Sequence, residues 1–554
     1  MEGKQSVGFL KLPTEIILAI CPHLPNRDIK SLRLTCSFFR ETAALRLDRI
    51  FLSANPRNID VFRAVATHEV YRRQIKEIIY DDARLYDYKY NLSTLRQTKS
   101  LVHDDIDALL NDCSYDEVTE LLHSRVIRLN FPPGEEYCPP SFVSARKAKL
   151  IIEQLESSNG SDVDRPDHYP RSPELAPAGA MTPNHCWQVY SELKNQQTEV
   201  IETGSDTKCL KEALTEKWFP ALKRITLTPA AHGFLFTPLY ETPMIRAFPR
   251  GFIYPATRGW PVFQQPIRRR AWEDLDDESK DQWRGFRIIT DLLAHVPNHG
   301  VTEFVVDVNQ LLTGVNCTIF TQPCAEYDNL ASLLQQPNFE RLDLALMVQG
   351  HHEAASTLRN GNLRRALAGA RHLKHISLRT DDIMRDSYIA IILHDPDPWY
   401  VPLRTVFPTD QWLCLSHFGL GHFIVKQSDL ISLLDALPAL RSVELACLWF
   451  LEGSHRGMLE EMRCGLDWRH RAPEARVKIS IALPMPLGDR PQCRIWIDRE
   501  VHDFIYGAGR NPFCEHDGGK YSVDAGTGIV RDAFDICHER PNLGHSTWSE
   551  QAIV

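Results

Sequence analysis

The sequence predicts a mixed α/β fold in which a small N-terminal module of three helices precedes a long region of alternating helices and short strands. Two observations indicate the alternation. Short segments of the form apolar-x-x-apolar-x-apolar recur along the chain, and three of them follow an amphipathic helix that ends near a proline. A third observation predicts the module: within residues 10–50, apolar side chains recur at helical spacing.

The first helix of the module is expected to begin at Pro13, because a proline in the first turn loses no hydrogen bond. Glu15 then lies at the positive end of the helix dipole. Pro22 is expected to stop this helix at Cys21. One face carries apolar side chains four residues apart, namely Leu12, Ile16 and Ile20.

Two more short helices are expected after Pro22. Asn26 is a suitable cap for the second helix, in which Ile29 and Leu32 point inward. Thr35 is a suitable cap for the third, whose apolar residues follow helical spacing: Cys36, Phe39, Ala43 and Ile50. Three short helices cannot bury three apolar faces alone, so we expect a partner or the following domain to cover part of this surface.

Six strands are expected from the apolar pattern: Ile75/Ile78/Tyr80, Leu222/Ile225/Leu227, Val301/Phe304/Val306, Phe339/Leu342/Leu344, Leu373/Ile376/Leu378 and Leu440/Val443/Leu445. In a chain with 43% hydrophobic residues the pattern alone matches about 8% of positions by chance, so its context carries the prediction. Pro297, Pro337 and Pro438 each lie between an apolar helical segment and one of these strands.

The middle residues of three strands, Phe304, Leu342 and Ile376, lie 38 and 34 positions apart. The next interval, 67 residues to Val443, leaves room for one more unit, with residues 412–415 as the missing strand. This succession resembles a degenerate leucine-rich-repeat solenoid, in which each unit buries its face on its neighbours. The units are longer than the common repeat and show no asparagine ladder, so a non-repetitive α/β domain stays open as an alternative.

Composition changes along the chain divide it into five expected regions. They are the helical module at 8–52, a helical connector with the first repeat-like elements at 53–156, a flexible linker at 157–184, the repeat-like region at 185–490 with an insertion at 228–280, and a C-terminal strand with a loosely ordered tail at 491–554. Serine, glycine, aspartate and proline mark the linker.

Charge and cysteine content exclude several classes of protein. The net charge of −9 argues against general nucleic-acid binding, although residues 1–50 carry eight Lys or Arg against five Asp or Glu, a local charge of +3 that suits an acidic partner. Neither a secretory signal nor an apolar stretch long enough to span a bilayer is found. The 14 scattered cysteines indicate reduced thiols, and hence the cytoplasm, the nucleus or both.

The N-terminal module resembles the F-box family, and the resemblance covers residues 10–50 without a gap. It is carried by Leu12-Pro13-x-Glu15-Ile16, followed by Ile20, Leu24-Pro25, Asp28, Leu32, Leu34, Cys36 and Phe39. Pro22 departs from the family pattern because it shortens the first helix. The resemblance implies a substrate-recognition subunit of an SCF-type ubiquitin ligase, bound to a Skp-family adaptor and through it to a cullin. It also implies an adaptor-facing surface made by Leu12, Pro13, Ile16, Ile20, Leu24 and Leu32.

Signatures of catalysis are mostly absent, and no cofactor or metal is expected. The sequence has no Walker phosphate loop, no G-x-S-x-G elbow and no H-E-x-x-H helix. Local groupings such as His351-His352, 394–398 and 514–516 are typical of surface histidines, a turn and a glycine-rich segment. The chain is therefore expected to be a non-catalytic receptor for an unidentified protein target. Two alternatives stay open: an adaptor-bound protein without ligase activity, and an enzyme with an unrecognised site in the helix–strand region.

Overall fold

The structure is a computed structural model of the whole chain. It describes residues 12–24, 26–85, 181–233, 238–254, 260–261, 270–309, 311, 313–348, 354–381, 399–484, 493–513, 523–532 and 539–542, with the backbone alone at Pro22 and Asp532.

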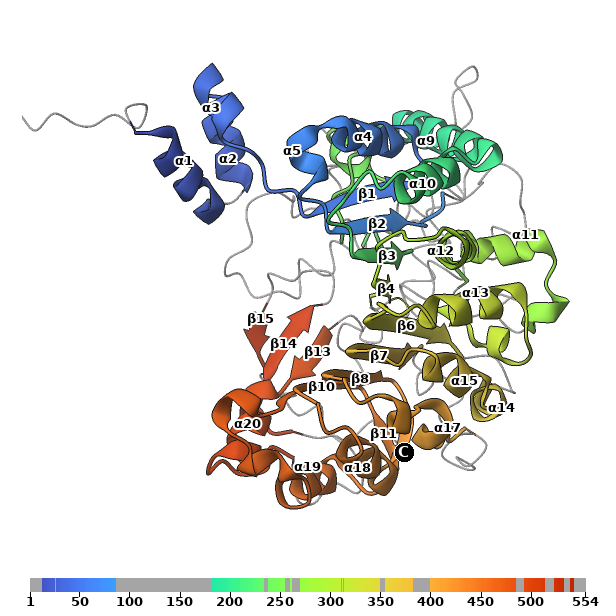
Figure 1. Cartoon of the computed structure of the whole chain (residues 1–554), viewed down its shortest axis with the longest axis vertical. Coiled ribbons are helices and arrows are strands. Elements are labelled where there is room, and N and C mark those ends of the chain that lie inside the picture. Colours follow the sequence, from blue (N-terminus) through green and yellow to red (C-terminus); the bar gives the residue numbers. More distant parts are fainter. Residues whose placement is uncertain are drawn as a thin grey trace, which may run out of the picture.

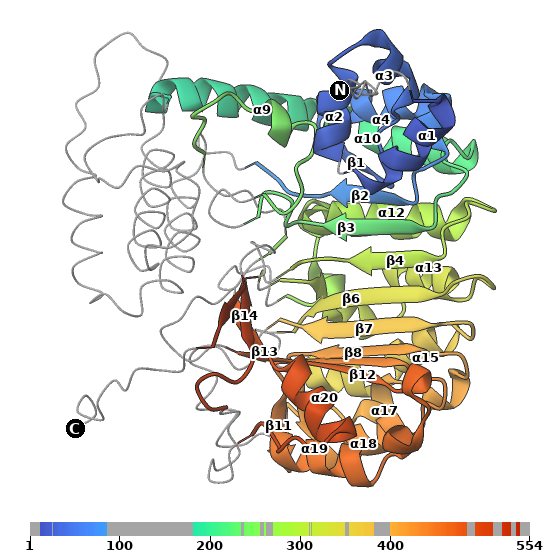
Figure 2. The ribbon, with the colours of Figure 1, turned by 90° about the vertical axis from the view of Figure 1, so that its left-hand side faces the viewer.

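One large sheet organises the chain. Within the described residues it has 13 strands, and nine of them lie side by side in parallel and in chain order. These are β1 (Arg49–Ser53), β2 (Glu77–Asp81), β3 (Arg224–Thr228), β4 (Glu303–Val306), β6 (Arg341–Met347), β7 (His375–Thr380), β8 (His417–Gly421), β10 (Ser442–Ala446) and β12 (Lys478–Pro484). Figure 2 shows them stacked from one end of the molecule to the other. The mixed α/β prediction is confirmed.

Three antiparallel strands continue the sheet beyond β12: β13 (Cys493–Trp496), β14 (Ile529–Asp532) and β15 (Glu539–Pro541). The short β5 (Val315–Asn316) pairs with β6, while β9 (Ile424–Lys426) and β11 (Trp449–Glu452) form a separate pair. Together with α20 (Asp498–Tyr506), the three strands β13–β15 give region 491–554 more regular structure than the single strand and loose tail that we predicted.

Helices follow the strands along the chain. The α-helices are α1 (Thr14–Ile20), α2 (Asn26–Arg33), α3 (Ser37–Thr42), α4 (Pro56–Thr67), α5 (Glu69–Arg72), α9 (Pro183–Thr203), α10 (Ser205–Thr215), α11 (Asp277–Lys280), α12 (Arg284–His295), α13 (Ala325–Leu334), α14 (Ala354–Arg359), α15 (Asn362–Ala368), α17 (Leu403–Val406), α18 (Gln427–Asp435) and α19 (His455–Cys464). Figure 1 shows α12, α13 and α15 along one face of the sheet, with β13–β15 toward the other face.

Short 3₁₀ turns connect many of these elements. They are η2 (Cys21–His23), η3 (Ile245–Ala247), η5 (Trp272–Asp274), η6 (Asp281–Trp283), η7 (Cys317–Phe320), η8 (Thr409–Gln411), η9 (Asp467–His470) and η10 (Pro473–Ala475). Three of them, with the four-residue α11, are the regular elements in the described parts of the predicted insertion at 228–280, or directly after it.

All six predicted strands lie on strands of the sheet, at β2, β3, β4, β6, β7 and β10. The prediction that residues 412–415 supply the missing strand was wrong, because these residues precede β8 rather than form it. Leu415, Phe418 and Leu420 repeat the same apolar pattern, so the missing strand was present in the sequence a few residues later. The helices before Pro297, Pro337 and Pro438 end as predicted, at α12, α13 and α18.

Equivalent apolar residues of neighbouring strands lie directly beside one another. The middle column of the sheet consists of Ile50, Ile78, Ile225, Phe304, Leu342, Ile376, Phe418, Val443 and Ile479. Every member is at most 4% exposed and belongs to one continuous core with the helices. Because side chains alternate between the faces of a strand, this register places the apolar column on the helix side. The intervening column on the other face is mixed: it begins with Phe51, Ile79, Thr226 and Val305 and continues through Asp343 to Glu444 and Ser480.

Several strands end in a turn that a side chain closes. The Asp81 carboxylate accepts from the amide of Ala83 at 3.0 Å, the Thr228 hydroxyl oxygen from Ala230 at 3.0 Å and the Asp307 carboxylate from Asn309 at 2.9 Å. Aspartate and threonine thus satisfy the turn amides at strand ends, in a chain whose sequence has no asparagine ladder.

A buried ion pair joins α10 to α12 beneath the sheet. Asp206, which is fully buried, accepts two hydrogen bonds from the Arg284 guanidinium at 2.6 and 2.8 Å. The hydroxyl of Tyr80 on β2 donates to the same carboxylate at 2.6 Å. This group fixes two helices against the second strand, at positions that nothing in the apolar pattern marks.

Most of the predicted connector and linker lie outside the described residues. Of region 53–156 the structure describes 53–85, which form α4, α5 and β2. Of the linker at 157–184 it describes 181–184, where Pro183 already begins α9.

Candidate functional site

The N-terminal module, α1–α3 with η2, has a small core of its own. Figure 1 shows it beside the end of the sheet that carries β1. Among the described residues this core consists of Ile17, Cys21, Ile29, Phe39 and Ala43, and it is separate from the core of the sheet. So few buried side chains give a folded unit of marginal stability.

Two capping predictions for this module were wrong. The Asn26 side chain does not cap α2: its oxygen accepts from the amide of Arg46 at 2.9 Å and its nitrogen donates to the carbonyl of Arg46 at 2.7 Å. Thr35 donates back to the Leu32 carbonyl at 2.7 Å and closes α2, so that Cys36 precedes α3 without a side-chain cap. Pro13 is the residue before α1, so the helix begins one residue later than predicted, at Thr14. It also ends one residue earlier, at Ile20, because Cys21 and Pro22 belong to η2.

The third predicted helix was too long. It ends at Thr42, and Ile50 lies in β1 and in the core of the sheet. Leu47, Ile50 and Leu52 follow the apolar strand pattern, which competes with helical spacing at this point. The predicted range 8–52 therefore contains part of a strand of the sheet.

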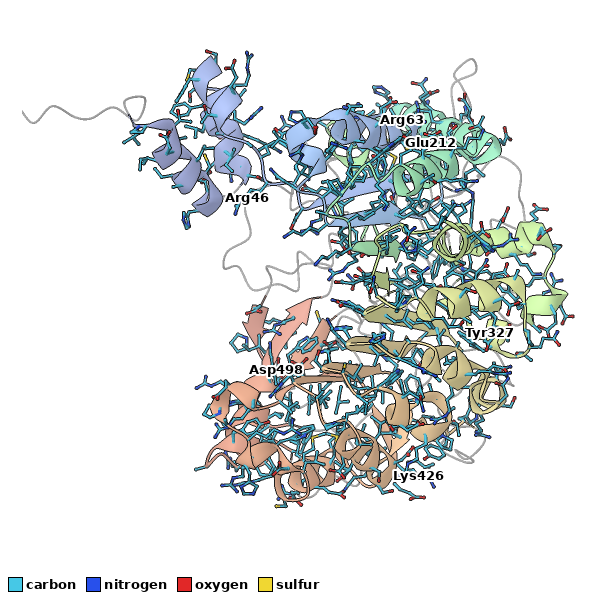
Figure 3. The ribbon with its side chains drawn as sticks, in the orientation of Figure 1. Arg46, Arg63, Glu212, Tyr327, Lys426 and Asp498 are labelled. Carbon is cyan, nitrogen blue, oxygen red and sulfur yellow. The ribbon has the colours of Figure 1, made fainter. Side chains whose placement is uncertain are left out.

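The junction between module and sheet is short. Leu45 packs against the core of the module, and Leu47 packs against the core of the sheet. Between them, Arg46 is bound through its backbone to Asn26, while the amide of Leu47 donates to the Gln74 side chain at 3.1 Å. Figure 3 shows Arg46 at this junction.

The six residues expected to face an adaptor differ in exposure. Ile16 is 46% exposed and Pro13 is exposed, whereas Ile20 is half-buried. Leu12, Leu24 and Leu32 are half-buried against the core of the module. Ile16 and Pro13 thus offer accessible apolar surface, and the three leucines also hold the module together.

Three more apolar side chains of the module are exposed: Leu18 at 51%, Leu34 at 88% and Phe38 at 36%. Sequence reasoning did not place them on the surface. Since Ile17 points into the core of the module, its neighbours Ile16 and Leu18 are turned about 100° away from it. Exposed large apolar side chains gathered in so small a unit are typical of a protein-interaction surface.

We expect Ile29→Ala to unfold the module alone. Ile29 is fully buried in the core of the module, and truncating such a residue costs about 2–5 kcal/mol, which a unit of this size cannot sustain. Hydrogen exchange followed by mass spectrometry should show rapid exchange throughout 14–42 and unchanged protection in β2–β12. The exposed Leu34→Ala is the control without effect, and lost protection in the sheet would contradict separate cores.

The second candidate surface is the polar face of the sheet, opposite the helices. Its outermost row consists of the in-register residues Arg49, Glu77, Arg224, Glu303, Arg341, His375, His417, Ser442 and Lys478. Charges alternate along the first five, and Arg224 contacts Glu303 at 2.6 Å. Such cross-strand pairs stabilise neighbouring strands and also leave charged groups at the surface.

Two histidines on this face stack on each other. The rings of His375 and His417 lie 3.9 Å apart and nearly parallel. His375 contacts the Asp343 carboxylate at 2.9 Å, and Arg341 contacts the same carboxylate at 2.6 Å. His417 instead bonds to the Ser442 hydroxyl at 2.7 Å.

Burial, with a smaller contribution from the neighbouring His375, lowers the pKa of His417 to about 4, so this ring is neutral at pH 7. Burial alone would raise the pKa of Asp343, but hydrogen bonds from His375 and Arg341 bring it below its ordinary value. The carboxylate and the serine contact different imidazoles. In a nucleophilic triad one histidine contacts both the carboxylate and the hydroxyl, so these four residues do not form a triad.

The other groupings considered for catalysis, His351-His352, 394–398 and 514–516, lie outside the described residues. Within the described ranges no group of three or more His, Cys, Asp or Glu side chains is placed to hold a metal ion. In the same ranges none of the helices has the length and apolar content needed to cross a membrane.

Comparison with models of known protein families gave no match for this chain, and no curated protein sequence matches it.

Proposed function

We propose that this chain is an F-box protein, the substrate-recognition subunit of an SCF-type ubiquitin ligase. In this proposal α1–α3 dock on a Skp-family adaptor, which links the chain to a cullin, and the helix–strand region holds a protein target. The observation that carries the proposal is the apolar surface of the module. Its core is formed, yet Ile16 and Leu34 remain 46% and 88% exposed.

The arrangement of the sheet supports the second half of the proposal. Nine parallel strands in chain order, with equivalent residues in register and helices along one face, are what an irregular leucine-rich-repeat-like solenoid would give. In this proposal the target contacts the charged outer row of the other face, from Arg49 to Lys478.

In this proposal the chain performs no chemistry itself. Ubiquitin would be transferred by a conjugating enzyme bound elsewhere in the complex. The receptor would raise the effective concentration of target lysines near that enzyme, through two binding surfaces held at a fixed distance.

The test is adaptor capture by the double variant Ile16→Asp/Leu34→Asp. Both side chains are exposed, so the module should stay folded while capture falls at least about 100-fold, since two buried charges at an interface cost several kcal/mol. Affinity capture of the full-length chain with purified Skp-family adaptor measures this. Leu32 is less suitable for substitution because it packs against the core of the module.

Leu413→Asp is the matched control, because Leu413 is 73% exposed and lies outside the module. Capture should equal that of the unsubstituted chain. Undiminished capture by the double variant would exclude docking through this surface. Recovery of the adaptor without a cullin, after crosslinking in cells, would favour an adaptor-bound protein without ligase activity.

A further inference from the structure

Four neighbouring segments lead into the strands β7, β8, β10 and β12 at one edge of the sheet. They comprise residues 369–374, 412–416, 436–441 and 465–477, and we call them the basic edge. Together they carry six Lys or Arg against two Asp or Glu, in a chain whose net charge is −9. The sign of the charge at this edge is therefore opposite to that of the chain as a whole.

Backbone hydrogen bonds hold these segments side by side. The Ser416 amide donates to the Lys374 carbonyl and the Arg441 amide donates to the Ser416 carbonyl, each at 2.8 Å. In the segment before β8, Trp412 and Leu415 are fully buried in the core of the sheet. The basic edge is therefore held in place by the same core as the strands.

Two arginines connect segments of the basic edge while keeping their charge. A guanidinium nitrogen of Arg441 donates to the Ala475 carbonyl at 2.9 Å, and one of Arg471 donates to the Leu440 carbonyl at 3.0 Å. A carbonyl is neutral, so it orients a guanidinium without cancelling its charge. Within the described ranges neither arginine has a carboxylate partner. Both therefore keep further N–H groups that an anion can accept from.

Arg371 is a third cation of this edge without a carboxylate. It is exposed, and its side chain makes no contact with a partner in the part of the chain that the structure describes. Lys374 in the same segment differs, because the Glu340 carboxylate binds it at 2.6 Å. Arg371, Arg441 and Arg471 are therefore the cations that a partner's carboxylates can pair with.

Helix ends do not account for most of this charge. The dipole of a helix attracts cations near its last turn, and the attraction falls off beyond that turn. Lys374, Arg441 and Arg471 lie six or seven residues beyond the ends of α15, α18 and α19. Only Arg371, three residues beyond α15, is close enough for this effect.

An exposed apolar side chain lies among these cations. Leu413 is 73% exposed and stands three residues before Ser416. Arg371 and Pro438, both exposed, stand at the same distance before the residues that bond to Ser416. Since neighbouring strands are about 4.8 Å apart, these three positions lie side by side. A partner that covers this edge gains apolar contact as well as charge.

We infer that the basic edge binds an acidic segment of a partner protein, one in which carboxylates flank an apolar side chain. Carboxylates pair with Arg371, Arg441 and Arg471, and the apolar side chain covers Leu413. Charge complementarity selects this partner. Four strands span about 15 Å, the length of about four extended residues, so a short segment is long enough.

Nucleic acid fits this edge less well, because the net charge of −9 repels a polyanion of high charge density. The inference goes beyond the proposed function, since these residues belong neither to α1–α3 nor to the outer row from Arg49 to Lys478.

The test measures fluorescence anisotropy of labelled, N-acetylated peptide amides mixed with the full-length chain. The acidic probe is Glu-Glu-Leu-Glu-Glu, and Gln-Gln-Leu-Gln-Gln is its neutral counterpart. The acidic peptide should bind at least about tenfold more tightly, and its binding should weaken as the salt concentration rises. Equal binding of the two peptides, or binding of neither, would overturn the inference.

Single-stranded RNA and vesicles containing phosphatidylserine are the other anionic probes. Tighter binding of either one than of the acidic peptide would overturn the assignment to a protein segment.

Arg371→Glu should weaken binding of the acidic peptide at least about tenfold. The melting temperature should not change, because this side chain is exposed and has no partner within the described residues. Arg441→Gln is the second variant. Glutamine can still donate to the Ala475 carbonyl, so weaker binding by this variant reports the lost charge.

Lys223→Glu is the matched control, because Lys223 is an exposed cation on the same edge of the sheet, next to β3. It undergoes the same change of charge as Arg371→Glu and should bind the acidic peptide like the unsubstituted chain. Equal binding by all four forms would contradict the site. Adaptor capture by Arg371→Glu should be normal, which separates this test from that of the proposed function.

Discussion

Asp206→Ala is expected to lower the free energy of unfolding of the sheet by about 3–5 kcal/mol. The substitution leaves Arg284, which is 8% exposed, without the carboxylate that accepts its two hydrogen bonds. It also removes the acceptor of the Tyr80 hydroxyl. Urea denaturation followed by circular dichroism measures the loss.

The control is the double variant Asp206→Ala/Arg284→Met, which removes both charges and should recover part of the lost stability. A loss below about 1 kcal/mol in the single variant would mean that water replaces the carboxylate and that the pair is not structural.

Asp81→Asn should have the opposite effect and increase stability at alkaline pH. Burial raises the pKa of Asp81 to about 7, with a smaller contribution from Asp82. The folded chain therefore favours the protonated acid, and its stability falls as pH rises from about 4, the ordinary pKa of aspartate, through about 7. Asparagine is never charged, so the variant should be more stable by about 2–4 kcal/mol at pH 8 and by much less at pH 5.

Urea denaturation of both forms at pH 5, 6.5 and 8 measures this difference. Asparagine keeps an oxygen that can accept from the amide of Ala83, so the turn at the end of β2 is retained. Asp81→Leu, which lacks that oxygen, is the control that separates charge from turn geometry. A gain independent of pH would contradict burial of a charged carboxylate.

Local apolar pattern predicted the strands well because it reports directly on burial. Ile225, Phe304, Leu342, Ile376 and Val443 were each identified as the middle of a strand, and each lies in the central column of the sheet. The same pattern at Ile50 was outweighed by helical spacing from Phe39 and Ala43. Where two periods fit one segment, the long-range pairing of β1 with β2 decides, and the sequence does not display that pairing.

Polar contacts were harder to predict because they join residues far apart in the chain. Asn26 carries the signature of a helix cap, yet it binds the backbone of Arg46. The partners Asp206 and Arg284 are 78 residues apart, so no local pattern marks the pair. For the predicted adaptor surface, the sequence indicated which residue types are present. It did not indicate their exposure, which depends on the fold: Ile16 is exposed and Leu32 is half-buried.

The short junction at Arg46 and Leu47 has a mechanical consequence. Leu45 packs against the core of the module and Leu47, two residues later, against the core of the sheet, so the two are joined without a free tether. A flexible linker lets a bound cargo sample a wide volume, whereas a stiff joint restricts it to a narrow arc. Any protein held on the sheet would then present the same few surface groups to whatever is docked on α1–α3. Which of those surface groups is reached would then depend on the geometry of this joint rather than on the amino-acid sequence around each group.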